Sequence, residues 1–258
     1  LFDKNTFEHL ASSTYQGQGP DEITIIGHVG IDETNRRFFV SDHGKLKIFA
    51  YDLDSVLTTP EYQPSVKIDM KKKLFPDDYL YLNDTLCIAK IIEPIGNNDY
   101  KPSVARWNMA TGEINPMPYE YPDLKKVRFI YAASAEHQLY VQCYTQYDLM
   151  TICDFNGNLK CNIYGPKWVN EKTQTQHYSL GVEFCGDKIL ALYSGGDHRT
   201  DAYYPTKFLV FDLNGNYLKT LETGYMITDF CYDKENNRLI INLNDEIQFA
   251  YLDLEGII

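Results

Sequence analysis

The sequence predicts an all-β fold, a β-propeller of four-stranded antiparallel blades that forms a single domain over residues 1–258. Two observations carry this prediction. One strand-turn-strand phrase recurs six times along the chain, and a second phrase of the same kind precedes every copy except the first. A third observation agrees with them, because helical periodicity with capping residues appears nowhere over a convincing length.

The first phrase is an apolar strand, then Asp or Asn, a short turn and a second strand. It occurs at 1–10, 49–58, 105–114, 151–160, 209–218 and 249–258. Its polar residues are Asp3, Asp52, Asn108, Asp154, Asp212 and Asp253. The chemistry predicts a β-hairpin, since Asn156–Gly157 and Asn214–Gly215 tolerate positive φ and the preceding Asp or Asn can bond back to the turn amides.

The second phrase has the same strand-turn-strand form and supplies two more strands per repeat. It occurs at 30–42, 81–90, 133–143, 184–193 and 231–243. Units of four strands that repeat every 40–50 residues or so are typical of propeller blades. Six blades are expected, with only an outer hairpin of the N-terminal blade present at 1–10. Five blades, with that hairpin as an addition, are the alternative.

The stretch "YQGQGPDEI" at 15–23 raises a second interpretation, a phosphate-binding glycine loop. Such a loop needs a third glycine and a following helix. Glu22 stands where that glycine would be, and the next residues are β-branched and strand-like. The stretch is therefore expected to be a crossover between blades, in which Gly17 and Gly19 permit a bend and Pro20 blocks an unwanted ladder bond.

At this point the chain resembles a known family. The hairpin at 1–10, then G-x-G-P-x-E at 17–22, D-x-x-N-x-x-x-x-V-x-D at 32–42 and "KLKIFAYDL" at 45–53 look like the six-bladed TolB-like or NHL-like propellers of Bacteroidetes. The resemblance is specific over roughly residues 1–55. It implies an exported, often lipid-anchored envelope protein at the periplasm or outer-membrane surface of a Gram-negative bacterium. Because the chain opens with "LFDKNTF", any export signal would lie upstream, as would the lipobox cysteine that would confirm a lipid anchor.

Composition excludes several classes of function. The net charge of −12 argues against nucleic acid and anionic membranes as partners. No stretch approaches the length of apolar sequence that a transmembrane helix needs. The six cysteines lie in strand-like runs without a CxxC pair. A disulfide between Cys153 and Cys161, which flank one turn, is left open.

Long loops are expected on one face, where a rigid scaffold would present them to a ligand. They lie at 14–21, 93–103, 164–177 and 194–206, with further crossovers expected at 59–65 and 116–123. Aromatic faces beside amides and carboxylates suit a sugar or an extended peptide. The candidate ligand-binding residues are Tyr15, Asn97, Tyr100, Trp168, Asp197, His198, Arg199, Tyr203 and Tyr204. The alternative is that the tyrosines pack between blades. The segment "GGDHRTD" would then be a solvated loop tip rather than a metal site or the site of a general base.

An enzymatic alternative also stays open. Six-bladed lactonases are similar in architecture and hold calcium in a central funnel, and Ca²⁺ prefers oxygen ligands. The weak metal candidates at inner-strand positions are Glu22, Asn83, Glu183 and Asp229. The chain has no G-x-S-x-G and no H-E-x-x-H motif. The main hypothesis is therefore a non-catalytic binding or scaffold propeller without a cofactor, with a glycan, peptide or protein as its partner.

Overall fold

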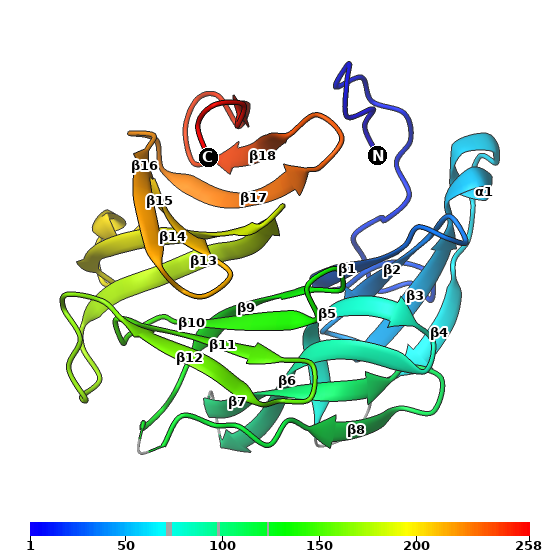
Figure 1. The fold of residues 1–258 in the computed structure, drawn as a ribbon. Coiled ribbons are helices and arrows are strands. Elements are labelled where there is room, and N and C mark those ends of the chain that lie inside the picture. Colours follow the sequence, from blue (N-terminus) through cyan, green and yellow to red (C-terminus); the bar gives the residue numbers. More distant parts are fainter. Residues whose placement is uncertain (71–73, 97–98, 123) are drawn as a thin grey trace. The chain divides into compact units, whose positions relative to one another are not determined.

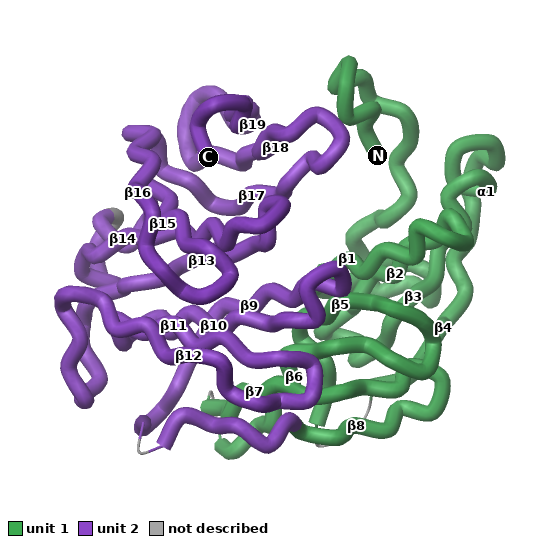
Figure 2. The backbone as a smooth tube through the Cα atoms, viewed as in Figure 1, with its two compact units in different colours: residues 1–116 green, residues 117–258 purple. Residues whose placement is uncertain are grey.

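The computed structural model describes residues 1–70, 74–96, 99–122 and 124–258. These residues form five antiparallel sheets, each of which is one blade of an all-β propeller (Figure 1). The predicted fold class is confirmed, and the described residues form five blades, the alternative count, rather than the expected six. The chain divides into two compact units, residues 1–116 and residues 117–258 (Figure 2).

Unit 1 contains two blades of four strands. The first has the order β1 (Ile26–Asp32), β2 (Arg37–Asp42), β3 (Lys47–Asp52) and β4 (Ser65–Asp69), with helix α1 (Leu53–Thr58) between its last two strands. The second has the order β5 (Phe75–Asn83), β6 (Leu86–Gly96), β7 (Asp99–Asn108) and β8 (Glu113–Pro116). Both are simple meanders, in which each strand pairs with the next one along the chain.

Unit 2 contains three blades. The first has the order β9 (Phe129–Ser134), β10 (Leu139–Tyr144), β11 (Leu149–Asp154) and β12 (Leu159–Tyr164). The second has β13 (Thr175–Cys185), β14 (Lys188–Asp197), β15 (Lys207–Asp212) and β16 (Tyr217–Glu222), with the 3₁₀ turn η1 (Asp201–Tyr203) before β15. The third has β17 (Ile227–Asp233), β18 (Arg238–Leu243) and β19 (Phe249–Asp253).

The polar residue of the first phrase forms local hydrogen bonds as its chemistry predicts. In all six copies of the first phrase, the Asp or Asn side chain accepts hydrogen bonds from backbone amides two to four residues further on. Gly157 and Gly215 have φ of 80° and 85°, a region that glycine enters without a Cβ penalty. Because each bond joins near neighbours in the chain, these turns are specified locally.

One predicted hairpin is wrong. Residues 53–58, expected as the second strand of the hairpin at 49–58, form α1 instead. Asp52 is the reason, since its Oδ1 accepts a hydrogen bond of 2.8 Å from Ser55 N and so caps the helix. Val56 then turns into the core of the blade. The segment 59–65 therefore joins α1 to β4 within one blade and is not a crossover between blades.

The last blade also departs from the prediction, because the expected strand after Asp253 is absent and the described sheet has three strands. Leu254 is fully buried among side chains of the last two blades. The amides of Ile257 and Ile258 donate to Leu254 O, so the chain turns back on itself. Burial of Leu254, worth roughly 1.5–3 kcal/mol, favours this turn over a further strand.

Neighbouring blades within each unit pack through alternate residues of their strands. Phe39 of β2 faces the adjacent blade, where it joins Tyr79 and Trp107, whereas Phe38 and Val40 face the other side. This alternation follows from the two-residue period of a strand. In the same way, the side chains of unit 2 form two buried clusters, one on each face of the blade β13–β16.

The six cysteines are free thiols. Cys153 lies on β11 opposite Leu159, and Cys161 lies on β12 opposite Ile152, with a bulge between the two pairs. Cys161 Sγ donates instead to Asn214 O at 3.4 Å. Cys153 and Cys161 are therefore not joined by a disulfide.

Candidate functional site

Two of the predicted ligand loops, 164–177 and 194–206, meet in unit 2. Thr175 pairs with Asp197 at the end of the β13–β14 ladder. Beyond this pair, the backbone N of His198 donates to Gln174 O at 3.1 Å, and its Nδ1 donates to the same oxygen at 2.9 Å. The two loops are therefore fastened to each other by main-chain hydrogen bonds, as a continuation of one hairpin.

A buried carboxylate holds the start of the first loop. Asp148 Oδ2 accepts from Lys167 N at 2.9 Å, and Asp148 O accepts from Gly165 N at 2.8 Å. A Cβ on residue 165 would lie 2.2 Å from the carboxylate of Asp148, so only glycine permits this approach. Because Asp148 is 1 % exposed, the loop begins at a fixed point below the surface.

The end of the same loop converges on this carboxylate through a buried histidine. Nδ1 of His177 lies 3.2 Å from the hydroxyl of Tyr193, which donates to Asp148 Oδ1 at 3.4 Å. His177 N also donates to Thr145 O at 2.8 Å. Burial lowers the pKa of His177, although the charge of Asp148 acts in the opposite direction. The imidazole is accordingly neutral at pH 7.

Three aromatic side chains gather above this base. We call Tyr121, Tyr164 and Trp168 the aromatic platform. The ring of Trp168 lies 5.1 Å from that of Tyr164 and 5.9 Å from that of Tyr121, at interplanar angles of 60° and 67°. Tyr147 supports them from below, since its ring is buried 6.3 Å from Trp168 and its hydroxyl donates to Lys125 O at 2.8 Å. Such tilted and edge-to-face contacts are the favoured geometries of aromatic pairs.

The platform remains open to solvent on its outer side. Tyr164 is 49 % exposed, and the hydroxyls of Tyr164 and Tyr121 lie 3.2 Å apart at the surface. Trp168 is half-buried, and its backbone N donates to Gly165 O at 3.0 Å. The arrangement combines apolar ring surface with hydroxyl groups in one exposed patch.

The second loop is closed by its own polar contacts. Arg199 binds Asp197 through Nε at 3.1 Å and Nη2 at 2.9 Å. Hydrogen bonds from Arg199 lower the pKa of Asp197 to about 2. The rings of Tyr203 and Tyr204 lie 4.2 Å apart. The charges of Asp197 and Arg199 thus neutralise each other.

The predicted ligand residues of unit 1 do not gather in the same way. Tyr15 is 60 % exposed in the crossover, where its carbonyl accepts from Ile23 N at 2.8 Å. Tyr100 lies within β7, paired with Pro94 of β6, so most of the expected loop 93–103 is an extended hairpin. Asn97 lies outside the described residues.

The four metal candidates occupy both units. Glu22 Oε2 accepts from Gly19 N at 2.6 Å, and Asn83 Oδ1 accepts from Thr85 N at 3.0 Å, so both of these unit 1 side chains serve their own turns. In unit 2, burial is the largest cause that raises the pKa of the Cys231 thiol, and the charges of Glu183 and Asp229 raise it further. Over the part of the chain that the structure describes, no group of three or more His, Cys, Asp or Glu side chains is arranged to hold a metal ion.

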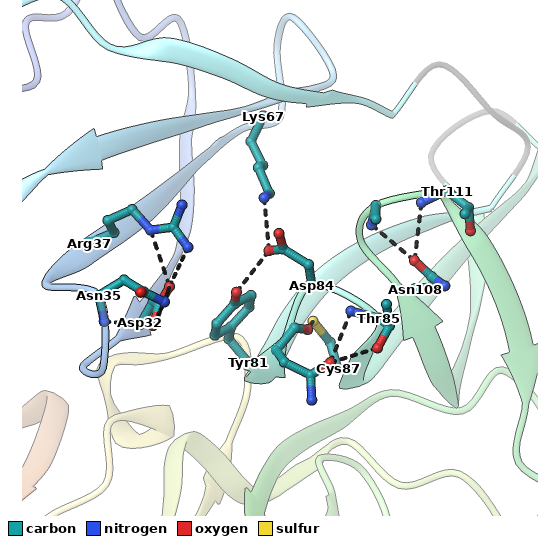
Figure 3. A network of polar contacts seen from close by, with 12 residues as sticks. Asp32, Asn35, Arg37, Lys67, Tyr81, Asp84, Thr85, Cys87, Asn108 and Thr111 are labelled. Carbon is teal, nitrogen blue, oxygen red and sulfur yellow. Dashed lines mark hydrogen bonds and ion pairs between the residues drawn. The ribbon is translucent and has the colours of Figure 1, made fainter.

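A polar network joins the two blades of unit 1 near their short turns (Figure 3). Lys67 of β4 and the hydroxyl of Tyr81 both donate to Asp84 Oδ1 at 2.8 Å. Asp32 accepts from Arg37 Nη2 at 2.6 Å and from Asn35 Nδ2. Burial raises the pKa of Asp32, but the hydrogen bonds from Asn35 and Arg37 outweigh it and the pKa is lowered. The Lys67–Asp84 pair links the two blades, and the contacts of Asp32 stabilise the β1–β2 turn of the first blade.

Sequence reasoning identified Trp168 and the loop that carries it, but it missed the base of the site. Asp148 and His177 were not expected to act together, and Tyr121 was not separated from the other tyrosines. The available signal was polar residues that immediately flank apolar strands, as in "TQYDLM" and "QTQHYSL". That pattern marks many turns, so the convergence of these residues became visible only in the fold.

The comparisons with known proteins agree with this architecture. A family model, DUF5128, described as a 6-bladed beta-propeller, matches residues 10–85. Among solved structures, a member of the DUF4221 family from Bacteroides vulgatus is similar over 98 % of this chain and 85 % of that one, at 12 % identity and a TM-score of 0.64. None of the curated proteins matches the chain significantly.

Further neighbours include a domain that is described as extracellular. The extracellular domain of BT4673 from B. thetaiotaomicron, described in one crystal structure as a one component system and in another as a hybrid two component system, has a TM-score of 0.57 at 11 % identity. In the first of these structures, 98 % of this chain is covered, but it spans only 31 % of that domain. A nidogen/laminin complex is similar over 90 % of this chain and 76 % of that one, at 11 % identity and a TM-score of 0.56. At these identities the likeness establishes the propeller fold.

Within the described ranges, none of the helices has the length and apolar character needed to cross a bilayer.

Proposed function

We propose that this chain is a non-catalytic binding propeller of the bacterial cell envelope, which presents the loops 164–177 and 194–206 of unit 2 to a glycan, peptide or protein. The observation that carries the proposal is the fastening of these loops to each other and to the buried Asp148 and His177. Surfaces held rigidly in a binding geometry lose little conformational entropy when a ligand binds.

The chemistry of the loops supports binding rather than catalysis. Their exposed aromatic rings offer contact area, and the charged groups of Asp197 and Arg199 are already paired with each other. His177 is neutral but 1 % exposed, so it serves the base of the loop and is out of reach of a substrate. A general base must lie within hydrogen-bond reach of the proton that it takes.

The envelope location rests on the resemblance in residues 1–55 and on the extracellular domain among the structural neighbours. It is tested in cells by expression of the complete gene product with an epitope tag, followed by fractionation and protease treatment of intact cells. Recovery in the periplasm or membrane fraction is expected. Recovery in the cytoplasmic fraction would contradict the location.

The binding role is tested by exposure of the purified chain to arrays of saccharides and of extended peptides. Wild type is expected to bind at least one immobilised probe. Trp168→Ala is expected to lose this binding, whereas Tyr217→Ala, an exposed tyrosine at the start of β16, is expected to keep it. Equal binding by wild type and Trp168→Ala would show that the ligand contacts another surface.

A further inference from the structure

We infer that the aromatic platform of Tyr121, Tyr164 and Trp168 is a saccharide site, in which a pyranose ring lies against the rings of Trp168 and Tyr164. This inference rests on the proposed binding function and specifies its ligand class. Each ring of the platform touches the other two, with centroid separations of 5.1, 5.9 and 6.4 Å. Their planes meet at 60°, 67° and 76°, so the three rings form a tilted, edge-to-face cluster.

The chemistry of a pyranose matches such a surface. One face of the sugar ring presents C–H groups, which are apolar and slightly positive, and the π-face of an aromatic ring is negative. The hydroxyls of the sugar lie around its edge and need hydrogen-bond partners. The Tyr164 hydroxyl, which lies 3.2 Å from that of Tyr121, is at the exposed rim of the platform, where it can supply such a bond.

The surroundings of the platform favour a sugar over a proline-rich peptide, which also binds to aromatic grooves. The exposed residues of the loop after Trp168 are mostly polar, namely Asn170, Glu171, Lys172 and Gln174. Amide, carboxylate and ammonium groups pair well with neighbouring hydroxyls of a saccharide. A proline-rich segment has few groups that would use them, because proline lacks a backbone N–H.

The loop is already shaped for this role without a ligand. Asp148 holds its start through Lys167 N, and His177 holds its end through Thr145 O. Tyr147 fills the space beneath Trp168. A small saccharide, which gives modest contact area, binds best to a surface that needs no rearrangement.

The chain itself supplies a reporter for the test. It contains two tryptophans, and Trp107 is only 1 % exposed in unit 1. A saccharide on the platform therefore changes the fluorescence of Trp168 alone. The probes are xylohexaose, cellohexaose, maltohexaose and tetragalacturonic acid, together with each saccharide bound in an array, and a decaproline peptide serves as the comparison ligand.

The expected result is a shift in emission and protection of Trp168 from acrylamide quenching by at least one saccharide. Trp168→Phe keeps an aromatic face but loses the signal, so the wild-type spectrum minus the Trp168→Phe spectrum isolates the reporter. By calorimetry, Trp168→Ala and Tyr164→Ala are each expected to weaken the affinity about tenfold or more, and Tyr217→Ala to leave it unchanged. Circular dichroism establishes that the variants are folded, and Tyr164→Ala decides the case if Trp168→Ala is not.

Three outcomes overturn the inference. If no saccharide alters Trp168 fluorescence, or if a saccharide binds equally well to both alanine variants, the platform is not a sugar site. If decaproline or an arrayed peptide binds in their place and Trp168→Ala abolishes it, the ligand class is wrong while the proposed binding function stands. If no probe of any class binds to wild type, the inference and the proposed function fail together.

Discussion

Nδ1 of His177 lies 3.7 Å from Oδ1 of Asp148, and each of the two side chains is only 1 % exposed. Asp148 lies just before β11, which pairs with β12, the strand that leads into the loop 164–177. His177 lies at the end of that loop, so the contact between the two side chains closes the base of the loop. Tyr193 bridges them through its hydroxyl. The loop that carries Tyr164 and Trp168 is thus held at its base by two buried polar side chains.

The first prediction concerns pH. Burial lowers the pKa of His177 from 6.5 in the folded state, whereas the unfolded chain keeps the ordinary value. The unfolded state therefore binds the proton more readily, and His177 contributes stability that is present above about pH 6.5 and lost as pH falls below it. The charged groups that act on the imidazole are Asp148 and Lys167.

Chemical denaturation at pH 7.5, 6.5 and 5.5, followed by Trp168 emission, measures this loss. His177→Gln is expected to flatten the profile in this range, and His9→Gln, at an exposed histidine, is expected to leave the profile as in wild type. A His177→Gln profile as steep as that of wild type would show that other groups carry the effect.

A second prediction concerns Asp148. Asp148→Ala leaves Lys167 N and the Tyr193 hydroxyl without their acceptor. An unsatisfied buried group costs about 1–3 kcal/mol, so the free energy of unfolding of unit 2 should fall by that amount or more. Asp148→Asn, which retains one acceptor oxygen, should lose less. Urea unfolding monitored at Trp168 provides the measurement, and equal losses in the two variants would contradict this account.

The third prediction concerns Gly165 and tests a steric effect without any change of charge. Gly165→Ala places a Cβ 2.2 Å from the Asp148 carboxylate, so the loop or the side chain must shift. Overpacking of this kind costs about 1–3 kcal/mol. Gly96→Ala, where a Cβ meets nothing within 4 Å, is the matched control and should be close to neutral. The comparison is made by thermal unfolding, and a neutral Gly165→Ala would refute the close approach.

Two adjacent arginines in unit 1 allow a fourth prediction. Arg37 pairs with the buried Asp32, whereas Arg36 pairs with the exposed Asp54. Asp32→Ala leaves the partly buried guanidinium of Arg37 without its carboxylate partner. The free energy of unfolding is expected to fall by about 2–3 kcal/mol. Asp54→Ala should have no measurable effect, because solvent screens exposed pairs.

Trp107 reports the unfolding of unit 1 and separates this effect from unit 2. The contribution of Asp32 also depends on acid, since its folded pKa is lowered from 3.8. Its stabilisation is present above about pH 3.8 and is lost as pH falls below that value. Equal destabilisation by the two aspartate variants would show that burial does not distinguish the pairs.

The fifth prediction concerns Cys231, which is the exposed cysteine of the chain. Partial burial raises the pKa of this thiol, and Glu183 and Asp229 raise it further. Because the thiolate is the reactive form, modification by a thiol reagent at pH 7.5 should be slow for an exposed cysteine. Glu183→Gln should accelerate it several-fold. A rate that the substitution leaves unchanged would exclude the carboxylate as a cause.

The local turns of this protein could be read from the sequence. Asp154 and Asp212 bond to amides two and four residues further on, and Gly157 and Gly215 adopt the positive φ that such turns demand. The errors were also local. Asp52 was read as the start of a hairpin, but the same side chain caps α1, because an Asp can accept from the amides of either a turn or a helix.

The candidate site was likewise predicted in part from local sequence. Trp168 and its loop were predicted from composition and length, as was the loop 194–206 that carries His198 and Tyr203. The contact between His177 and Asp148, and the approach of Tyr121 to Trp168, were not predicted.

By itself, the sequence determined the all-β repeat and the chemistry of its turns, because those depend on hydrogen bonds between residues a few positions apart. Only the tertiary structure decided which distant side chains share a site. Asp148 and Tyr193 meet because neighbouring blades pack face to face, and that packing is a property of two whole sheets rather than of any short stretch of chain.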